Sequence, residues 1–395
     1  MTKLFDRVTA LPGFTFFLNV DVGSDVTHEE LLAHHHAVLY AVGAPNDRRL
    51  DIEGMDLPGT GTATETVAWF NGHPEFTDLP VDLSHERVVI VGNGNVALDV
   101  ARILTTDPDA LARTDISDHA LATLRDSKVT EVVIAARRGP VHSAFTLPEL
   151  IGLASTCDVV LDGADHELVV GDLATATDPL TRNKLEILST LADASTPARR
   201  PRIRFAYQLT PTRILDAERV HGVEFTVTGT DEVRRLDAGL VLTSIGYRGK
   251  PIRDLPFDDA AGVVPNDGGR VLDAETGTAV RGSYVAGWIK RGPTGFIGTN
   301  KSCAGETVHS LVDDYNAGLL ADPVGKQAAL DKLVRRRRPD MVDAAGWKAI
   351  DAAEIARGGG ARPRDKFTTV VDMLAVAAAA PTPPMHKRLL AGLLR

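Results

Sequence analysis

The chain has 395 residues, of which 44% are hydrophobic and 24% charged, so it has ample apolar material for a buried core and a disordered chain is excluded. Its formal net charge of −10 argues against nucleic acid or an anionic membrane as a general partner. The two cysteines, Cys157 and Cys303, form no C-x-x-C pair, which excludes a cysteine-held iron–sulfur cluster and a thioredoxin-reductase-type redox disulfide. We interpret both as buried thiols of a protein in the reducing cytoplasm.

Neither end of the chain predicts a membrane association. The N-terminus has no apolar leader segment, and the nearly apolar stretch at residues 373–380 is far shorter than a membrane span. We therefore expect a soluble protein without a membrane or nucleic-acid partner.

Strand-like apolar runs alternate with helical patterns along the chain, which is typical of parallel α/β sheets. Residues 36–44 predict a buried strand that ends in a tight turn at Gly43. Residues 87–95 form a second apolar run, and the helical pattern VALDVARIL follows it. A polar, helix-capable stretch at 107–125 precedes the next strand, at 129–138.

The second half of the chain continues the same pattern. FTVTG and LVLTSIGYRG predict further strands, and residues 282–300 predict a strand, a loop rich in Gly and Pro, and the start of a helix. In the tail, we expect RRRRP at 335–339, the glycines at 358–360 and PTPP at 381–384 to form surface connections around short helices.

A G-x-G-x-x-A motif, with Gly92, Gly94 and Ala97, lies between the strand at 87–91 and its helix, which is the context of a Rossmann dinucleotide site. Gly92 allows a sharp turn, Gly94 leaves room for a pyrophosphate, and Ala97 lets the helix pack close to the strand. The free N–H groups at the start of the helix suit phosphate.

The end of the following strand indicates which dinucleotide is bound. An NAD site usually has an acidic residue there for the ribose 2′-hydroxyl, whereas this strand ends in Arg137 and Arg138. Two guanidiniums suit a 2′-phosphate. The residues from Arg87 to Glu149 therefore predict an NADP(H) site.

Five blocks of sequence resemble the adrenodoxin-reductase-like ferredoxin–NADP⁺ reductases, most of all the bacterial members. In chain order they are GNGNVALDVARIL, AARRGPVHSAFTLPEL, SIGYRGKPIRDLPFD, PNDGGRV and YVAGWIKRGPTGFIGTNKS. The resemblance implies an α/β protein with two Rossmann-like domains, the NADP domain being inserted in a discontinuous FAD domain. It implies that residues 1–46 and 245–395 belong to the FAD domain and residues 47–244 to the NADP domain. It also implies an enzyme that passes electrons from NADPH through FAD to a ferredoxin-type iron–sulfur protein.

The resemblance also implies which residues contact the cofactors, and it assigns no catalytic side chain or metal ligand, because the flavin carries the chemistry. For NADP they are Asn93, Gly94, Asn95, Val96, Arg137, Arg138 and Glu149, the last near the nicotinamide. For FAD they are Val22, Arg48, Trp288, Gly295, Phe296 and Ile297. Gly295 is also expected to touch the nicotinamide.

The chain departs from the family at its start. The first strand–turn–helix unit of the family, which holds the FAD pyrophosphate, has no counterpart here, so we expect an N-terminally incomplete FAD domain with exposed edge strands near Gly43. Two explanations stay open. The chain is a truncated copy or a piece of a longer fusion, which a Met1 in mid-domain favours, or it is a shorter protein that binds only NADP(H).

Two other functions remain possible on the sequence alone. One is an NADPH diaphorase or quinone reductase that uses no ferredoxin, and the other is a non-catalytic NADP(H)-binding module. A docking patch for an acidic ferredoxin could come from Arg199, Arg200, Arg202 and Arg204, although such charge runs are often only solvated surface.

Overall fold

The computed structural model describes residues 2–196, 201–295 and 297–380, with two compact units. Unit 2 comprises Asp47–Gly246 and Glu354–Thr369. Unit 1 comprises Met1–Asn46, Tyr247–Ala353 and Val370–Arg395. The chain leaves and re-enters unit 1 through the short strands β2 (Asn46–Asp47) and β13 (Tyr247–Arg248), which pair with each other.

Unit 2 is built on a seven-stranded sheet in which every neighbouring pair is parallel. In spatial order its strands are β3 (Thr60–Thr62), β12 (Leu240–Thr243), β4 (Arg87–Val91), β5 (Glu131–Ala135), β8 (Arg202–Ala206), β6 (Asp158–Leu161) and β7 (Ala192–Asp193). The near-continuous apolar sequences of β4 and β5 fit this place, because both faces of a parallel sheet are covered.

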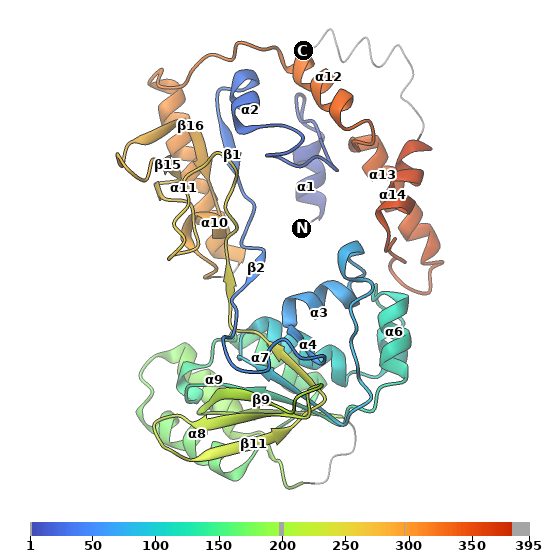
Figure 1. Ribbon diagram of the computed structural model, residues 1–395, viewed down its shortest axis with the longest axis vertical. Helices are drawn as coiled ribbons and strands as arrows, with labels where there is room; N and C mark the ends of the chain where they lie inside the picture. Colours follow the sequence, from blue (N-terminus) through green and yellow to red (C-terminus); the bar gives the residue numbers. More distant parts are fainter. Residues whose placement is uncertain (1, 197–200, 296, 381–395) are drawn as a thin grey trace. The chain divides into compact units, whose positions relative to one another are not determined.

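The two faces of this sheet are covered in different ways (Figure 1). Helices pack on one face, where Val88 and Ile90 of β4 belong to the same core as Leu98. These helices are α3 (Ala63–Phe70), α4 (Asn95–Thr105), α6 (Asp118–Arg125), α7 (Leu147–Thr156), α8 (Gly163–Thr175) and α9 (Pro179–Ser189). On the other face, Val89 and Val91 pack with residues of a three-stranded antiparallel sheet, namely β9 (Leu209–Leu215), β10 (Gly222–Val227) and β11 (Val233–Asp237).

Unit 1 contains a four-stranded sheet in the order β1 (Val38–Tyr40), β16 (Ala279–Val285), β15 (Arg270–Leu272) and β14 (Asn266–Asp267). The long helix α11 (Ile297–Asn316) is tied to it, since Thr307 Oγ1 donates to the Val285 carbonyl at 2.9 Å. The other helices of this unit are α1 (Thr2–Thr9), α2 (His28–His34), α10 (Trp288–Arg291), α12 (Gln327–Arg337), the start of α13 (Ala344–Arg357) and α14 (Val370–Ala378).

Several expectations about local structure need correction. The run at 36–44 gives only the three-residue strand β1, whose Leu39 is exposed and which pairs with β16 alone among the described residues. The helix-capable stretch at 107–125 forms two helices, α5 (Pro108–Leu111) and α6. Three of the four consecutive arginines end helix α12 instead of forming a loop. Cys303 is buried as expected, whereas Cys157 is only partly buried.

PTPP at 381–384 lies outside the described residues. In the part of the chain that the structure describes, no helix has the length and apolar character needed to cross a membrane.

Candidate functional site

The turn between β4 and α4 is shaped by a close approach of two backbone segments. Gly92 has φ +112°, and a Cβ there would lie 2.2 Å from the carbonyl oxygen of Ser244, the residue after the neighbouring strand β12. The Gly92 N–H donates to the Ala135 carbonyl of β5 at 2.8 Å. Gly92 is therefore needed both for its left-handed backbone and for the space that a side chain would fill.

The N-terminus of α4 has no side-chain cap. Its N-cap is Gly94, which offers no side-chain acceptor, and a Cβ at this position would meet nothing within 4 Å. The N–H groups of the first helical turn, at Asn95, Val96 and Ala97, have no intrahelical acceptor. By contrast, α2, α3, α8 and α9 are each capped by a Thr or Asp side chain. The open end suits an anion, because its free N–H groups and the helix dipole both favour negative charge.

The side chains of Asn93 and Asn95 connect this turn to the segment before α7. Asn95 Oδ1 accepts the Thr146 N–H at 2.8 Å, and Asn93 Oδ1 accepts the Ala144 N–H at 3.4 Å. Ala97, on the inner side of α4, is fully buried, as the close helix–strand contact requires. The sequence pattern did not predict these asparagine contacts, which join residues 51 positions apart.

Arg137 and Arg138 follow β5 directly, next to the Gly92 turn. The parallel register pairs Val91 with Ala135, so the carboxyl ends of β4 and β5 lie at the same edge of the sheet. Both arginines are exposed, and within the described residues neither guanidinium has an acidic partner. The Thr228 hydroxyl holds the Arg137 carbonyl at 2.7 Å. The pair is therefore placed where a 2′-phosphate would lie in a Rossmann site.

Glu149 lies in the first turn of α7 and is half-buried, so it is not a freely solvated surface residue. It lies close enough to Asp99 of α4 to affect that carboxyl. Burial raises the pKa of Asp99, the Arg102 guanidinium opposes the shift, and the Glu149 charge adds to it. Asp99 was not predicted as part of the site, although it lies within the motif helix.

Trp288 opens the short helix α10 in unit 1 and stacks on Tyr247, with ring centroids 5.5 Å apart. The indole nitrogen Nε1 is buried and has no hydrogen-bond partner among the described residues. A buried indole N–H normally finds an acceptor. A carbonyl group of a bound flavin is a suitable acceptor, so Trp288 fits a flavin site.

The loop that leads into α11 requires glycine at Gly295, which has φ +82° and where a Cβ would lie 2.7 Å from the Thr299 hydroxyl. Ile297 is the first residue of α11, and Phe296 lies outside the described residues. The buried ammonium of Lys290, in α10, donates to Glu306 Oε2 at 2.6 Å and to Thr307 Oγ1 at 3.0 Å, both in α11. Lys290 thus fixes the two helices that flank the loop.

The other two residues assigned to FAD, Val22 and Arg48, belong to different units. Val22 belongs to unit 1, where it is exposed and bridges to Val26. Arg48 belongs to unit 2 and is exposed. Its backbone N–H donates to the Gly246 carbonyl at 2.9 Å.

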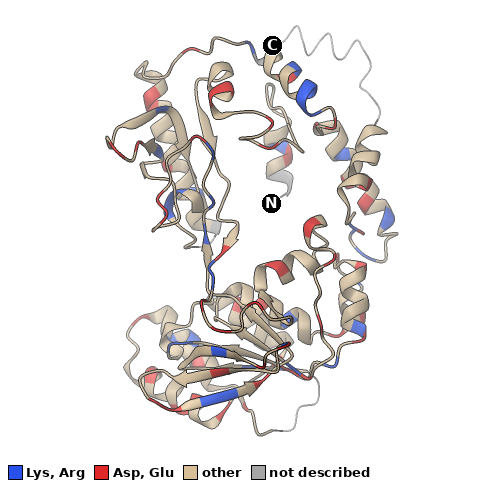
Figure 2. Cartoon of the chain, in the orientation of Figure 1, with Lys and Arg blue, Asp and Glu red and all other residues tan. Residues whose placement is uncertain are grey.

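The predicted ferredoxin-docking arginines need a correction. Arg199 and Arg200 lie outside the described residues, whereas Arg202 and Arg204 are largely buried and engage Glu131 at 3.0 and 3.5 Å. Arg87 reaches the same carboxylate at 2.7 Å. Arg202 and Arg204 therefore hold the sheet together and do not form a docking patch. Acidic and basic residues are interspersed over both units (Figure 2).

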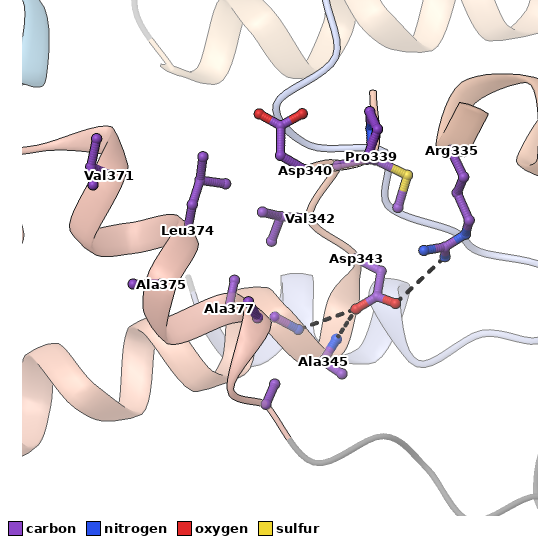
Figure 3. A pocket seen from close by; sticks show the side chains of 14 residues that line it. Arg335, Pro339, Asp340, Val342, Asp343, Ala345, Val371, Leu374, Ala375 and Ala377 are labelled. Atoms are coloured by element: carbon purple, nitrogen blue, oxygen red, sulfur yellow. Dashed lines mark hydrogen bonds and ion pairs between the residues drawn. The ribbon is translucent and has the colours of Figure 1, made fainter. Parts of the chain in front are cut away.

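A hollow of about 700 Å³ in unit 1 lies between α14 and the turn from α12 to α13 (Figure 3). None of the predicted cofactor residues lines it. Its Asp343 accepts the N–H groups of Ala345 and Gly346 at 3.0 and 3.1 Å and lies 3.6 Å from Arg335, so this charge is already compensated. The described residues include no group of three or more His, Cys, Asp or Glu placed to hold a metal ion.

Comparison with known proteins gives long matches. The chain is 68% identical over 397 residues to a probable ferredoxin/ferredoxin–NADP reductase of Mycobacterium tuberculosis, covering all of this chain and 69% of the relative. It is 40% identical to human mitochondrial NADPH:adrenodoxin oxidoreductase, covering 91% of this chain and 77% of the relative. The solved structure of M. tuberculosis FprA in complex with NADPH superimposes with a TM-score of 0.88 at 40% identity, covering 96% of this chain and 86% of FprA. No protein-family model matches the chain.

Proposed function

Since the chain belongs to the adrenodoxin-reductase-like ferredoxin–NADP reductases, we propose that it is a flavoprotein oxidoreductase that passes electrons between NADPH and a ferredoxin-type protein through FAD. The observation that carries the proposal is the juxtaposition of the open α4 N-terminus with two exposed arginines that have no acidic partner among the described residues. This arrangement offers one site for a pyrophosphate and another for a 2′-phosphate.

In this proposal, unit 2 binds NADP(H). The backbone N–H groups of Asn95, Val96 and Ala97 bind the pyrophosphate, and Gly94 leaves the space for it. Arg137 and Arg138 bind the 2′-phosphate, which selects NADP(H) over NAD(H). Glu149 lies toward the nicotinamide end of the nucleotide.

Unit 1 holds FAD in this proposal, through Trp288 and the consecutive residues Gly295, Phe296 and Ile297. The Trp288 N–H donates to the flavin, and the glycine turn brings backbone N–H groups at the start of α11 to it. When bound, FAD accepts a hydride from NADPH and releases single electrons to an iron–sulfur protein. Val22 and Arg48 complete the set that the family resemblance assigns to FAD.

The protein is proposed to act in the cytoplasm. Both cysteines are free thiols, which is the usual state in a reducing compartment. The membrane and nucleic acid are not expected partners, because the net charge of −10 opposes binding to polyanions.

The test is steady-state reduction of a ferredoxin by NADPH with the full chain after incubation with FAD. We expect saturable reduction of the ferredoxin that weakens as salt is added, because an electrostatic encounter is screened. Quinone reduction without ferredoxin reduction would instead support a diaphorase. Binding of NADP⁺ without any retained FAD would support a nucleotide-binding module and contradict the proposal.

A further inference from the structure

The segment Ser143–Thr146 lies between the 3₁₀ turn η2 (Pro140–His142) and α7, and its carbonyl and N–H groups bind different partners. Its carbonyl groups at Ser143 and Phe145 accept hydrogen bonds from Lys184 Nζ at 2.8 and 3.5 Å. Its N–H groups at Ala144 and Thr146 donate to the side chains of Asn93 and Asn95, as described above. One lysine thus fixes the segment from the side opposite the nucleotide turn.

The contacts with the segment also orient the two asparagine side chains. A backbone N–H requires an oxygen acceptor, so Oδ1 of Asn93 and of Asn95 must face the segment. Each Nδ2 group therefore points away from the segment and remains a donor. Both donors belong to the turn that we assign to the NADP(H) pyrophosphate.

The environment of Lys184 is unusual for a lysine. It lies on α9, is half-buried, and has its ammonium 5.7 Å from the centre of the Phe145 ring. Burial lowers the pKa of Lys184, and the Asp178 charge opposes that shift. Within the described residues no carboxylate lies within ion-pair distance of Nζ, and the ammonium donates instead to the two carbonyl groups. Hydrogen bonds from a charged donor are stronger than neutral ones, which makes this lysine an effective anchor.

Other contacts keep the same segment in place. The Ser143 hydroxyl donates to the Pro140 carbonyl at 2.8 Å and lies 3.1 Å from the Tyr207 hydroxyl. Asp172 accepts the Val141 N–H at 2.8 Å. These contacts fix residues 140–143, whereas Lys184 is the described side chain that reaches the carbonyl groups on both sides of Ala144.

We propose that Lys184 is a positioning residue for NADP(H). It holds segment Ser143–Thr146 so that the carboxamides of Asn93 and Asn95 present their Nδ2 donors to the dinucleotide. This inference rests on the proposed NADP(H) site, and it adds a residue of α9 that lies outside every nucleotide motif in the sequence.

The test compares the full-length Lys184→Met variant with the wild-type chain by calorimetric titration with NADP⁺. Met keeps an unbranched side chain that is one atom shorter and removes the donor, so the dissociation constant for NADP⁺ should rise about tenfold. With NADPH and a small chemical electron acceptor, the FAD-loaded variant should show a raised KM and an unchanged kcat, because Lys184 touches no reacting atom. Lys184→Arg should restore binding to within about threefold of the wild type, since it keeps a charged donor.

Two further variants separate positioning from general destabilisation. Arg182→Met is the matched control, since Arg182 lies on the same helix, is exposed and pairs with Glu186. It should leave NADP⁺ binding unchanged. In the Lys184→Met, Asn95→Ala double variant, the loss of affinity should be smaller than the product of the two single losses, because both act on one contact.

Binding of NADP⁺ by Lys184→Met within twofold of the wild type would overturn the inference, as would fully multiplicative losses in the double variant. A wild-type chain that fails to bind NADP⁺ would instead overturn the proposed function. If Lys184→Met does not fold, Lys184→Arg is compared with Asn95→Ala. Normal NADP⁺ affinity in Lys184→Arg together with reduced affinity in Asn95→Ala supports the inference. Equal losses of affinity in the two variants overturn it.

Discussion

In unit 2, the strand that leads into the nucleotide turn, β4, has a parallel neighbour on each side, β12 and β5. In unit 1, the parallel neighbour of β16 is β1, which is the last described strand on its side of the sheet. The turn after β4 is fixed by the Ser244 backbone and by two asparagine side chains. The loop before α11 depends on Lys290 and on glycine at Gly295.

The two proposed cofactor sites therefore differ in how many strands and contacts of their own unit hold them in place. The proposed NADP(H) site has its phosphate donors, its arginines and its supporting strands within one unit. The proposed FAD site has a buried donor at Trp288, but its sheet ends at a three-residue strand. We therefore expect the stability and the affinity for NADP⁺ to respond to changes in unit 2, and FAD retention to respond to changes in unit 1.

The largest effect is expected from Glu131→Ala in unit 2. Burial by itself would raise the pKa of Glu131, but the guanidiniums of Arg204, Arg87 and Arg202 outweigh it and lower the pKa. Removing this buried carboxylate takes away the acidic partner that Arg87 and Arg202 have among the described residues and leaves Arg204 with only the more distant Asp162. The free energy of unfolding should therefore fall by about 3 to 5 kcal/mol. Urea denaturation measures the loss, and Glu86→Ala, an exposed position next to β4, should change it by less than about 0.5 kcal/mol.

The same carboxylate gives a pH dependence with a defined sign. Because its folded pKa is lowered from the ordinary 4.5, its contribution is present above pH 4.5 and is lost as the pH falls through the folded pKa. A Glu131→Ala variant that loses stability on acidification as steeply as the wild type would contradict this role.

A smaller effect, of opposite pH dependence, is expected from Asp165→Asn. Asp165 is buried at the start of α8 and accepts the Tyr207 N–H at 3.0 Å. Burial, with the adjacent Asp162 charge, raises its pKa from 3.8 to about 7. Its stabilising effect is therefore complete below pH 3.8 and is lost as the pH rises through about 7.

Asparagine keeps the acceptor and cannot ionise. Between pH 4 and pH 8 the variant should gain roughly 2 to 4 kcal/mol of unfolding free energy relative to the wild type. Urea denaturation at the two pH values measures this difference, and parallel pH profiles for variant and wild type would show that Asp165 is not the group responsible.

Arg137→Ala tests the choice of cofactor. Loss of a charge-assisted contact with the 2′-phosphate should raise the KM for NADPH by about 10- to 100-fold and leave that for NADH nearly unchanged. Arg113→Ala, at another exposed position of unit 2, is the control and should alter neither value. Equal changes for the two nucleotides would remove the phosphate role from Arg137.

The smallest effect is expected in unit 1, from Trp288→Phe. Phenylalanine keeps most of the stacking on Tyr247 but loses the indole N–H, so the dissociation constant for FAD should rise about threefold to tenfold. Fluorescence titration with FAD measures it. Trp347→Phe, at a residue that is 45% exposed, should bind FAD like the wild type, and an unchanged affinity in Trp288→Phe would argue against this contact.

Local patterns predicted the part of the site that depends on neighbouring residues. The strand, glycine turn and helix around Gly92 were predicted because each residue of the motif has a backbone role within a few positions. The placement of Arg137 beside that turn follows from parallel pairing of consecutive strands.

Contacts between distant residues were not predictable in the same way. Arg202 and Arg204 look like part of a surface charge run in the sequence. In the structure they are largely buried and form ion pairs with Glu131, about 70 positions earlier. The approach of Ser244 to Gly92 and the contact of Lys184 with Ser143 depend likewise on the assembled sheet. The apolar run at 36–44 predicted a longer strand, but with one described neighbour only three residues form strand hydrogen bonds.

Anaerobic absorption spectroscopy can show directly whether this chain transfers electrons from NADPH to ferredoxin through FAD. The chain is incubated with FAD, separated from free flavin, and mixed with NADPH and then with oxidised ferredoxin. We predict that flavin absorbance is retained by the protein, is bleached by NADPH and returns when ferredoxin is added. Retained flavin that NADPH does not bleach, or a chain that retains no flavin while still binding NADP⁺, would contradict the claim.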